Sequence, residues 1–229
     1  MPQTTVAALA AASAVSVLTL ATATVSAAQT PGPGTVIIPR DVLIFPATIN
    51  GGTGAAAAGA QQSTTQKQAQ DIVTNAFREY LSRSEIGVVV YNKRLPSVQR
   101  AVAEGLKAED AAAGPGDDER KALRFAQVVG AAEYITLDVT NYKYDAATRT
   151  ASFNVNVFRN SVEDNGAPLA TIAKPASGTS PADVSVPRQE GSALARAAAQ
   201  VAEETFQDLY PQVASLNAAK AAKENEKKK

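Results

Sequence analysis

The chain has 229 residues, and 45% of them are hydrophobic, which is enough to fill at least one sizeable core. Its 22 basic and 22 acidic residues cancel, which excludes the overall charge that draws a protein to nucleic acid or to an anionic membrane. The chain has no histidine and no cysteine, which excludes Ser-His-Asp and Cys-His catalysis, HExxH zinc sites, thiol chemistry and disulfide bonds.

Residues 1–28 are predicted to be a signal peptide. An apolar stretch from Val6 to Leu20 precedes the first charged side chain, Arg40, and small residues follow the stretch. Val25-Ser26-Ala27 has the small-x-small pattern of a cleavage site, so we expect the mature protein to start at Ala28 or Gln29. The absence of Lys and Arg from the first residues is atypical, and a buried Ala-rich helix or a retained anchor stays open as an alternative.

Export predicts a periplasmic or extracellular protein. Because the chain has no cysteine to carry a lipid, we expect no stable membrane insertion once the signal is removed. Residues 29–35 are rich in Pro and Gly and are predicted to be a linker, followed by a single domain over residues 36–212.

The first half of this domain is predicted to alternate strands and helices. Val42–Phe45 and Ile86–Tyr91 are continuously apolar, which is typical of internal strands covered on both faces. Residues 50–59 form a small-residue loop, and it is not a phosphate-binding loop because no Lys-Ser/Thr pair follows Gly59. Helices are predicted over residues 66–83, 95–105 and 119–129, with a loop at 111–117.

The helix over residues 66–83 has one apolar face, so Ile72, Phe77 and Leu81 are expected to be buried against the sheet. Farther along the chain the period changes to two. Residues 135–139 and 153–157 alternate apolar and polar side chains, which predicts two antiparallel strands with one polar face each, and Leu169–Ile172 is expected to add a third.

A Pro-rich loop over residues 175–187 is predicted to lead to the last helix, Ser192–Tyr210, and a charged tail covers residues 213–229. The fold class is therefore mixed α/β, with a mixed parallel and antiparallel sheet, helices packed on it, and the order β-α-β-α-α-β-β-β-α.

The polar face of the antiparallel strands is predicted to be a partner-binding face. The alternative is that this face is merely solvated, or lies under the last helix. The predicted face consists of Thr136, Asp138, Thr140, Tyr142, Ser152, Asn154 and Asn156.

Three segments together carry a resemblance to a known family. They are Val42–Pro46 with the helix around Asp71–Phe77, Val88–Arg94 with the following helix, and Phe125–Ile135. They resemble the envelope-protein family that includes the curli-secretion channel CsgG, the penicillin-binding-protein activator LpoB and the amino-terminal domain of TolB. The resemblance implies a module that binds other envelope components. The lipid-carrying cysteine and the membrane hairpins of a channel have no counterpart here, so a secretion pore is not expected.

The leading functional prediction is thus an exported, non-enzymatic cell-envelope binding or scaffold module without cofactor, metal or catalytic residues. Its partners would be envelope proteins or cell-wall components, and not nucleic acid. The alternative is a carboxylate-dependent hydrolase of the cell envelope, because paired acids can catalyse glycoside hydrolysis without histidine. A third interpretation is a cytosolic adaptor whose amino terminus only mimics a signal. Two acids converging in a pocket would favour the hydrolase.

Overall fold

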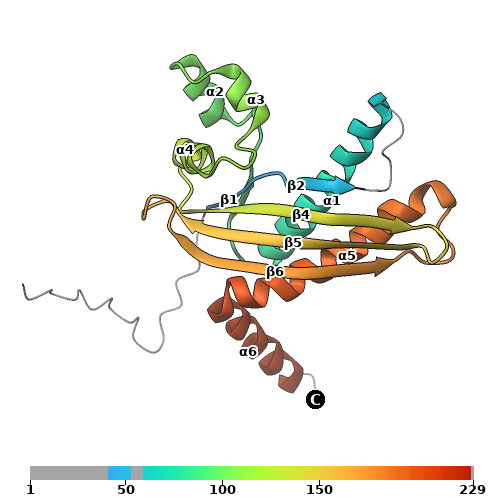
Figure 1. The fold of residues 1–229 in the computed structure, drawn as a ribbon. Helices are drawn as coiled ribbons and strands as arrows, with labels where there is room; N and C mark the ends of the chain where they lie inside the picture. Colours follow the sequence, from blue (N-terminus) through green and yellow to red (C-terminus); the bar gives the residue numbers. More distant parts are fainter. Residues whose placement is uncertain (1–40, 53–58, 228–229) are drawn as a thin grey trace, which may run out of the picture. The chain divides into compact units, whose positions relative to one another are not determined.

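The computed structural model of the protein describes residues 41–52 and 59–227. It is a mixed α/β structure in which helices pack on one mixed sheet, which confirms the predicted fold class (Figure 1). The predicted signal peptide over residues 1–28 and the linker over 29–35 lie outside the described residues.

The sheet has the strand order β3-β1-β4-β5-β6, and the short strand β2 also pairs with β4. The pairs β1–β3, β1–β4 and β2–β4 are parallel, whereas β4–β5 and β5–β6 are antiparallel. The strands are β1 (Val42–Ile44), β2 (Thr48–Gly52), β3 (Val88–Val90), β4 (Glu133–Asp145), β5 (Thr150–Ser161) and β6 (Pro168–Thr179).

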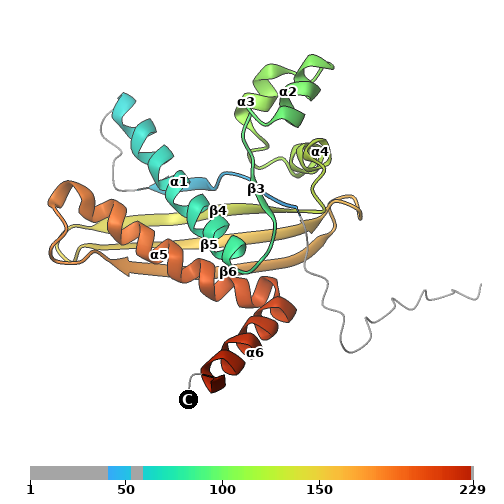
Figure 2. The same ribbon diagram turned by 180° about the vertical axis from the view of Figure 1, so that it is seen from behind.

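Helices α1 and α5 cover one face of this sheet, as Figure 2 shows from the helix side. Phe77 and Leu81 of α1 are buried, as predicted, in the larger core that also contains Val155 of β5, whereas Ile72 is only half-buried. The helices among the described residues are α1 (Gly59–Arg83), α2 (Pro96–Ala103), α3 (Ala108–Ala113), α4 (Glu119–Val129), α5 (Val186–Leu209) and α6 (Pro211–Lys227).

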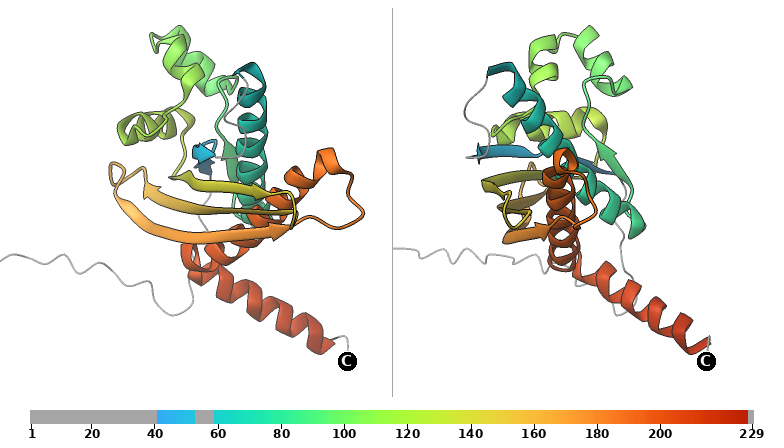
Figure 3. Two further views of the ribbon diagram at one scale, coloured as in Figure 1. Left: turned by 45° about the vertical axis from the view of Figure 1, so that its right-hand side comes forward. Right: turned by 90° about the vertical axis from the view of Figure 1, so that its right-hand side faces the viewer.

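A second, smaller core lies on the opposite face, at the end of the sheet that holds β1 and β3. Leu43 of β1 and Phe45, which follows β1, pack against α2, α3 and α4, with Phe125 among their neighbours. The alternate residues Val42 and Ile44 belong to the larger core on the other face. This alternation explains the continuous apolar sequence of β1, because both of its faces are buried. The smaller core covers only this end, so the opposite face of β4, β5 and β6 is left largely open (Figure 3).

Four sequence-based assignments need correction. The predicted loop over residues 111–117 is in part helical, because its first three residues belong to α3. Strand β3 is an edge strand and not an internal one, and its apolar residues are only half-buried. The predicted loop over residues 50–59 is in part strand β2 and the start of α1, with residues 53–58 outside the described residues. The predicted loop beginning at Pro175 continues β6 as far as Thr179, and Pro175 is tolerated because β6 is an edge strand that can spare one N–H donor.

The predicted charged tail is largely helical. Pro211 follows α5 and opens α6, a position where its missing N–H costs little. Val213 of α6 is buried in the larger core, and Lys220 Nζ lies 3.0 Å from Glu85 Oε1. Among the described helices, none combines the length and the apolar character needed to span a membrane.

Candidate functional site

Six of the seven predicted face residues lie together on the open side of the sheet. Asp138 on β4 is opposite Asn156 on β5, and Thr140 is opposite Asn154, so these side chains share one face. Their sequence neighbours Val139 and Val155 belong to the core beneath α1 and α5. Helix α5, which corresponds to the predicted last helix, therefore packs on the other face of the sheet, and the predicted face does not lie under α5 (Figure 1).

Tyr142 is the residue that does not lie on the predicted face. The pairing of β4 with β5 shifts between Thr140 and Lys143, where β4 has one extra residue and Asn141 has a φ of 56°. The bulge turns Tyr142 into the core, where it is 8% exposed and its hydroxyl donates to Glu190 Oε1 at 2.7 Å. Burial, together with the hydrogen bond to Glu190 and its charge, raises the pKa of Tyr142.

Strand β2 extends the open face beyond the residues that the sequence indicated. Asn50 lies beside Thr140 in the parallel ladder, and its Nδ2 donates to Asp138 Oδ1 at 2.8 Å. The hydrogen bond fixes the orientation of the Asp138 carboxylate. The only sequence signal for β2 is the alternation Thr48-Ile49-Asn50, which is too short to separate a strand from a loop.

A groove of about 490 Å³ lies between the open face and the start of α4. We call it the acidic groove, because four of its lining side chains are carboxylates and no Lys or Arg is among the described residues that line it. Its polar and charged lining residues are Thr48, Asn50, Asp117, Asp118, Glu119, Tyr134, Thr136, Asp138, Asn160 and Thr171. Thr136 and Asp138 of the predicted face therefore also line the acidic groove.

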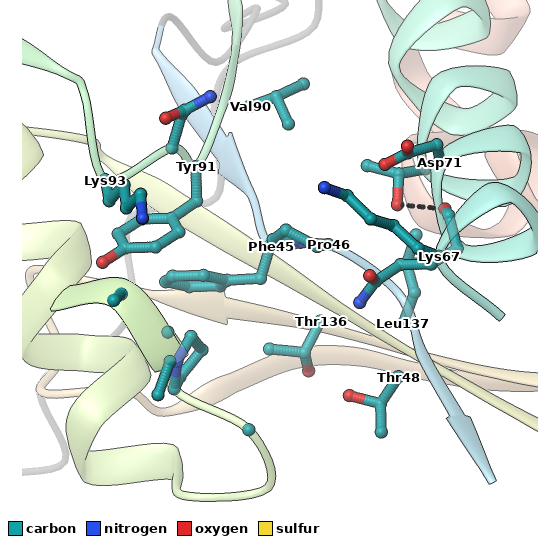
Figure 4. Close-up of a pocket in the computed structure, with 18 of the residues that line it drawn as sticks. Phe45, Pro46, Thr48, Lys67, Asp71, Val90, Tyr91, Lys93, Thr136 and Leu137 are labelled. Atoms are coloured by element: carbon teal, nitrogen blue, oxygen red, sulfur yellow. Dashed lines mark hydrogen bonds between the residues drawn. The ribbon is translucent and has the colours of Figure 1, made fainter. Parts of the chain in front are cut away.

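A second crevice, of about 410 Å³, lies beyond the carboxyl ends of β1 and β3 (Figure 4). The connection after β1 runs through α1 on one face of the sheet, whereas the connection after β3 runs through α2 to α4 on the other. This divergence opens a crevice between two parallel strands, which is where open α/β sheets commonly bind ligands. The crevice shares Thr48, Gly116, Thr136 and Leu137 with the acidic groove.

Two lysines from different elements line this crevice. Lys67 comes from α1 and Lys93 from the loop after β3, and Asp71 is the one carboxylate among the described lining residues. The sequence does not indicate this site, because the continuously apolar strands β1 and β3 carry no polar signal of their own. The crevice forms because the connections after β1 and after β3 leave the sheet on opposite faces. This depends on the order of the strands in the sheet, which the sequence does not give.

Hydrogen bonds hold one wall of this crevice to the sheet. Thr74 Oγ1 accepts from Ala47 N at 2.9 Å, and Gln70 Nε2 donates to the carbonyl oxygen of Ala47 at 2.7 Å. On the other wall, the Tyr91 hydroxyl donates to the carbonyl oxygen of Ala111 at 2.8 Å, and burial raises the pKa of Tyr91 to about 12. These bonds connect α1 and α3 to the strand ends and stabilise the shape of the crevice.

No family model matches the sequence, and no curated protein matches it. Among solved structures, the chain is similar to a point variant of the PelC dodecamer from Paraburkholderia phytofirmans, with 15% identity over 75% of this chain and 92% of that chain, at a TM-score of 0.39. It is also similar to the LpoB C-terminal domain from Salmonella enterica, with 16% identity over 61% of this chain and 84% of that chain, at a TM-score of 0.37.

A third similar structure is the hypothetical protein CT253 from Chlamydia trachomatis, with 11% identity over 76% of this chain and 99% of that chain, at a TM-score of 0.42. Similarities of this size do not assign a family. LpoB is one of the proteins named in the resemblance drawn from sequence, and the likeness to CsgG and TolB stays a prediction.

Proposed function

We propose that the protein is an exported, non-enzymatic cell-envelope binding module that captures its partner on the open face of β4 and β5. The observation that supports this proposal is the unequal covering of the sheet. One face of β5 is buried under α1 and α5, whereas Ser152, Asn154 and Asn156 point to the uncovered side. A flat polar surface on a hydrogen-bonded sheet presents donors and acceptors in fixed positions, which lowers the entropy cost of binding.

A paired-substitution experiment tests the face. We expect Asp138→Lys combined with Asn154→Arg to abolish capture of the envelope partner, because both positions lie on the open side and the change places two cations there. The matched control is Glu104→Lys combined with Gln127→Arg, which makes the same change in charge at exposed positions of the α2 and α4 region. Capture is measured by pull-down from an envelope fraction, with the bound components identified by mass spectrometry.

The control should retain capture, and its stability should change little, since exposed substitutions usually alter stability by about 0.5 kcal/mol or less. The first double variant should lose about 1 kcal/mol more, because the half-buried Asp138 also loses its hydrogen bond to Asn50, and a thermal melt verifies that it stays folded. Capture that survives on the first variant, but is lost when residues 51–59 are shortened, would show that the partner binds elsewhere.

Export is tested separately by amino-terminal sequencing of the native protein. The proposal expects a start at Ala28 or Gln29 in the exported fraction. Recovery of an intact Met1 or Pro2 start from the cytosol would contradict it and would favour the adaptor interpretation.

The acidic groove is the observation that favours the alternative, a carboxylate-dependent hydrolase. Two of its carboxylates already have structural partners, because Asp118 Oδ1 accepts from the backbone N–H groups of Arg120 and Lys121, and Asp138 Oδ1 accepts from Asn50. The hydrolase proposal predicts cleavage of cell-wall glycan by the purified chain, and loss of that activity in Asp117→Asn or Glu119→Gln. No cleavage by the unchanged chain would rule it out.

A further inference from the structure

The side chain of Tyr134 lies at the floor of the acidic groove. It is 2% exposed, packs edge-on against Phe45 with ring centroids 6.1 Å apart, and lines the groove. No hydrogen bond joins its hydroxyl to another described residue, and the hydroxyl oxygen is not one of the fully buried unpaired atoms, so it is reached from the groove. A phenylalanine would fill the same space, so the hydroxyl adds a polar group that is available to a ligand in the groove.

Space beside this hydroxyl is kept open by Gly166. A Cβ added at Gly166 would lie 3.0 Å from the Tyr134 oxygen, and the φ of +85° at this position also favours glycine. Burial and the negative charge of Glu119 raise the pKa of Tyr134, so the hydroxyl stays protonated and keeps both its donor and its acceptor capacity.

The carboxylates around Tyr134 retain acceptor capacity. Asp118 and Asp138 each use Oδ1 for a partner within the described chain, and no salt bridge within that part of the chain involves either of them, Asp117 or Glu119. No three such side chains among the described residues are placed to hold a metal ion. Carboxylates spread along a groove suit an organic cation, whose N–H groups can donate charge-assisted hydrogen bonds to several of them.

The groove also has an apolar wall. Phe158 of β5 and Pro168 of β6 line it, next to the carboxylates. Lysine and arginine side chains combine an aliphatic stem with a cationic end, and they commonly lay the stem along such a surface while the end reaches polar groups. An aromatic ring adds attraction for the cation itself.

We propose that the acidic groove binds a lysine or arginine side chain of the partner, with the ammonium or guanidinium group donating to the Tyr134 hydroxyl and to the surrounding carboxylates. The stem would lie along Phe158. This inference rests on the proposed function for the identity of the occupant, a polypeptide, but not for the chemistry of the groove.

The experiment titrates the purified full chain with pentapeptides that differ only in a central residue, which is lysine, arginine or the uncharged isostere norleucine. Free cadaverine is the fourth probe, and binding is followed by NMR chemical shifts. We expect the lysine or arginine peptide to bind at least tenfold more tightly than the norleucine peptide, and to weaken as salt is raised. Shifts should centre on Tyr134, Asp138 and Phe158.

Two variants test the contacts. Tyr134→Phe, which removes only the hydroxyl, should weaken the cationic peptide by about tenfold, the effect of a lost hydrogen bond to a charged group. Asp117→Asn, at an exposed position, should weaken it without unfolding the chain, and its thermal melt verifies the fold. Tyr144→Phe is the matched control, because Tyr144 is outside the groove, and it should bind as the unchanged chain does.

Equal binding of the norleucine and lysine peptides would overturn the proposal, as would full affinity in both Tyr134→Phe and Asp117→Asn. Cadaverine that binds as tightly as the peptide would show that the groove takes a free amine, which overturns the assignment to a partner side chain. These outcomes use defined probes and are independent of compartment. A failed export test would therefore leave the cation site supported. Envelope capture by a chain that does not bind the cationic peptides would contradict the cation site and leave the proposed function supported.

Discussion

The two faces of β5 differ in how they are covered. Phe153, Val155 and Val157 point into the core beneath α1 and α5 and are at most 2% exposed. Between them, Asn154 and Asn156 point to the open side. The difference teaches that the helix-covered face provides the stability of the sheet, so the residues of the open face are free to be selected for binding.

Polar side chains on the covered face make the same point. Arg159 is directed inward, and its Nε and Nη2 donate to the two carboxylate oxygens of Glu133 at 2.7 Å each. Its Nη1 donates to the carbonyl oxygen of Leu209 at 2.6 Å, at the end of α5, and its Cζ lies 4.0 Å from the ring centroid of Tyr210. Under the helices a polar group needs a partner, because desolvation without one is costly.

The largest expected effect comes from comparing alanine substitutions of two phenylalanines on opposite faces of β5. Phe153→Ala, on the covered face, should lower the free energy of unfolding by about 3–5 kcal/mol, because it leaves a cavity in the core. Phe158→Ala, on the open face, should lower it by about 1 kcal/mol, since its ring is already partly in water. Urea titration of both variants measures the difference, and equal losses would show that the open face is covered by something else.

A smaller effect is expected when the buried ion pair loses one member. Arg159→Met should destabilise the protein by about 3 kcal/mol, because it leaves the charge of Glu133, a side chain that is 13% exposed, with only the Tyr210 hydroxyl as a partner, and removes the cap on the end of α5. Equilibrium unfolding in urea is the measurement.

The control is Arg159→Met combined with Glu133→Leu, in which no charge is stranded. This double variant should recover most of the loss, since well-packed apolar pairs often replace buried ion pairs at little cost. A double variant as unstable as the single one would mean that the contacts of Arg159 with Leu209 and Tyr210 dominate.

The covered face was also the easier part to predict from sequence. Strict alternation over residues 135–139 and 153–157 predicts β4 and β5, and their apolar residues do form the core beneath α1 and α5. Small residues let β6 and α5 approach each other closely. At Gly178 of β6 an added Cβ would lie 2.5 Å from the carbonyl oxygen of Ala193 on α5, so the helix backbone does approach the strand closely.

The features of the candidate site that depend on three-dimensional neighbours could not be predicted. The bulge that removes Tyr142 from the open face has no local signal, because alternation alone carries the pattern through residues 140–143. Strand β2 pairs with β4, a partner that lies more than 80 residues farther along the chain and that local sequence cannot indicate. The acidic groove combines Asp117 and Glu119 with Asp138, and their convergence depends on where α4 crosses the sheet.

The smallest expected effect is a gain, and it tests the rule that polar groups under the helices need partners. Thr205 of α5 is 0% exposed, and its Oγ1 is the buried side-chain oxygen without a hydrogen-bond partner among the described residues. Thr205→Val keeps the shape and removes the unpaired hydroxyl, so the free energy of unfolding should rise by about 1 kcal/mol. Thr171→Val, at an exposed position on the open face of β6, is the control and should change it by about 0.5 kcal/mol or less. Thermal unfolding of both variants measures the contrast. A loss of stability in Thr205→Val would mean that the hydroxyl bonds an internal water, in which case this polar group is paired as well and the rule holds at Thr205 by a different route.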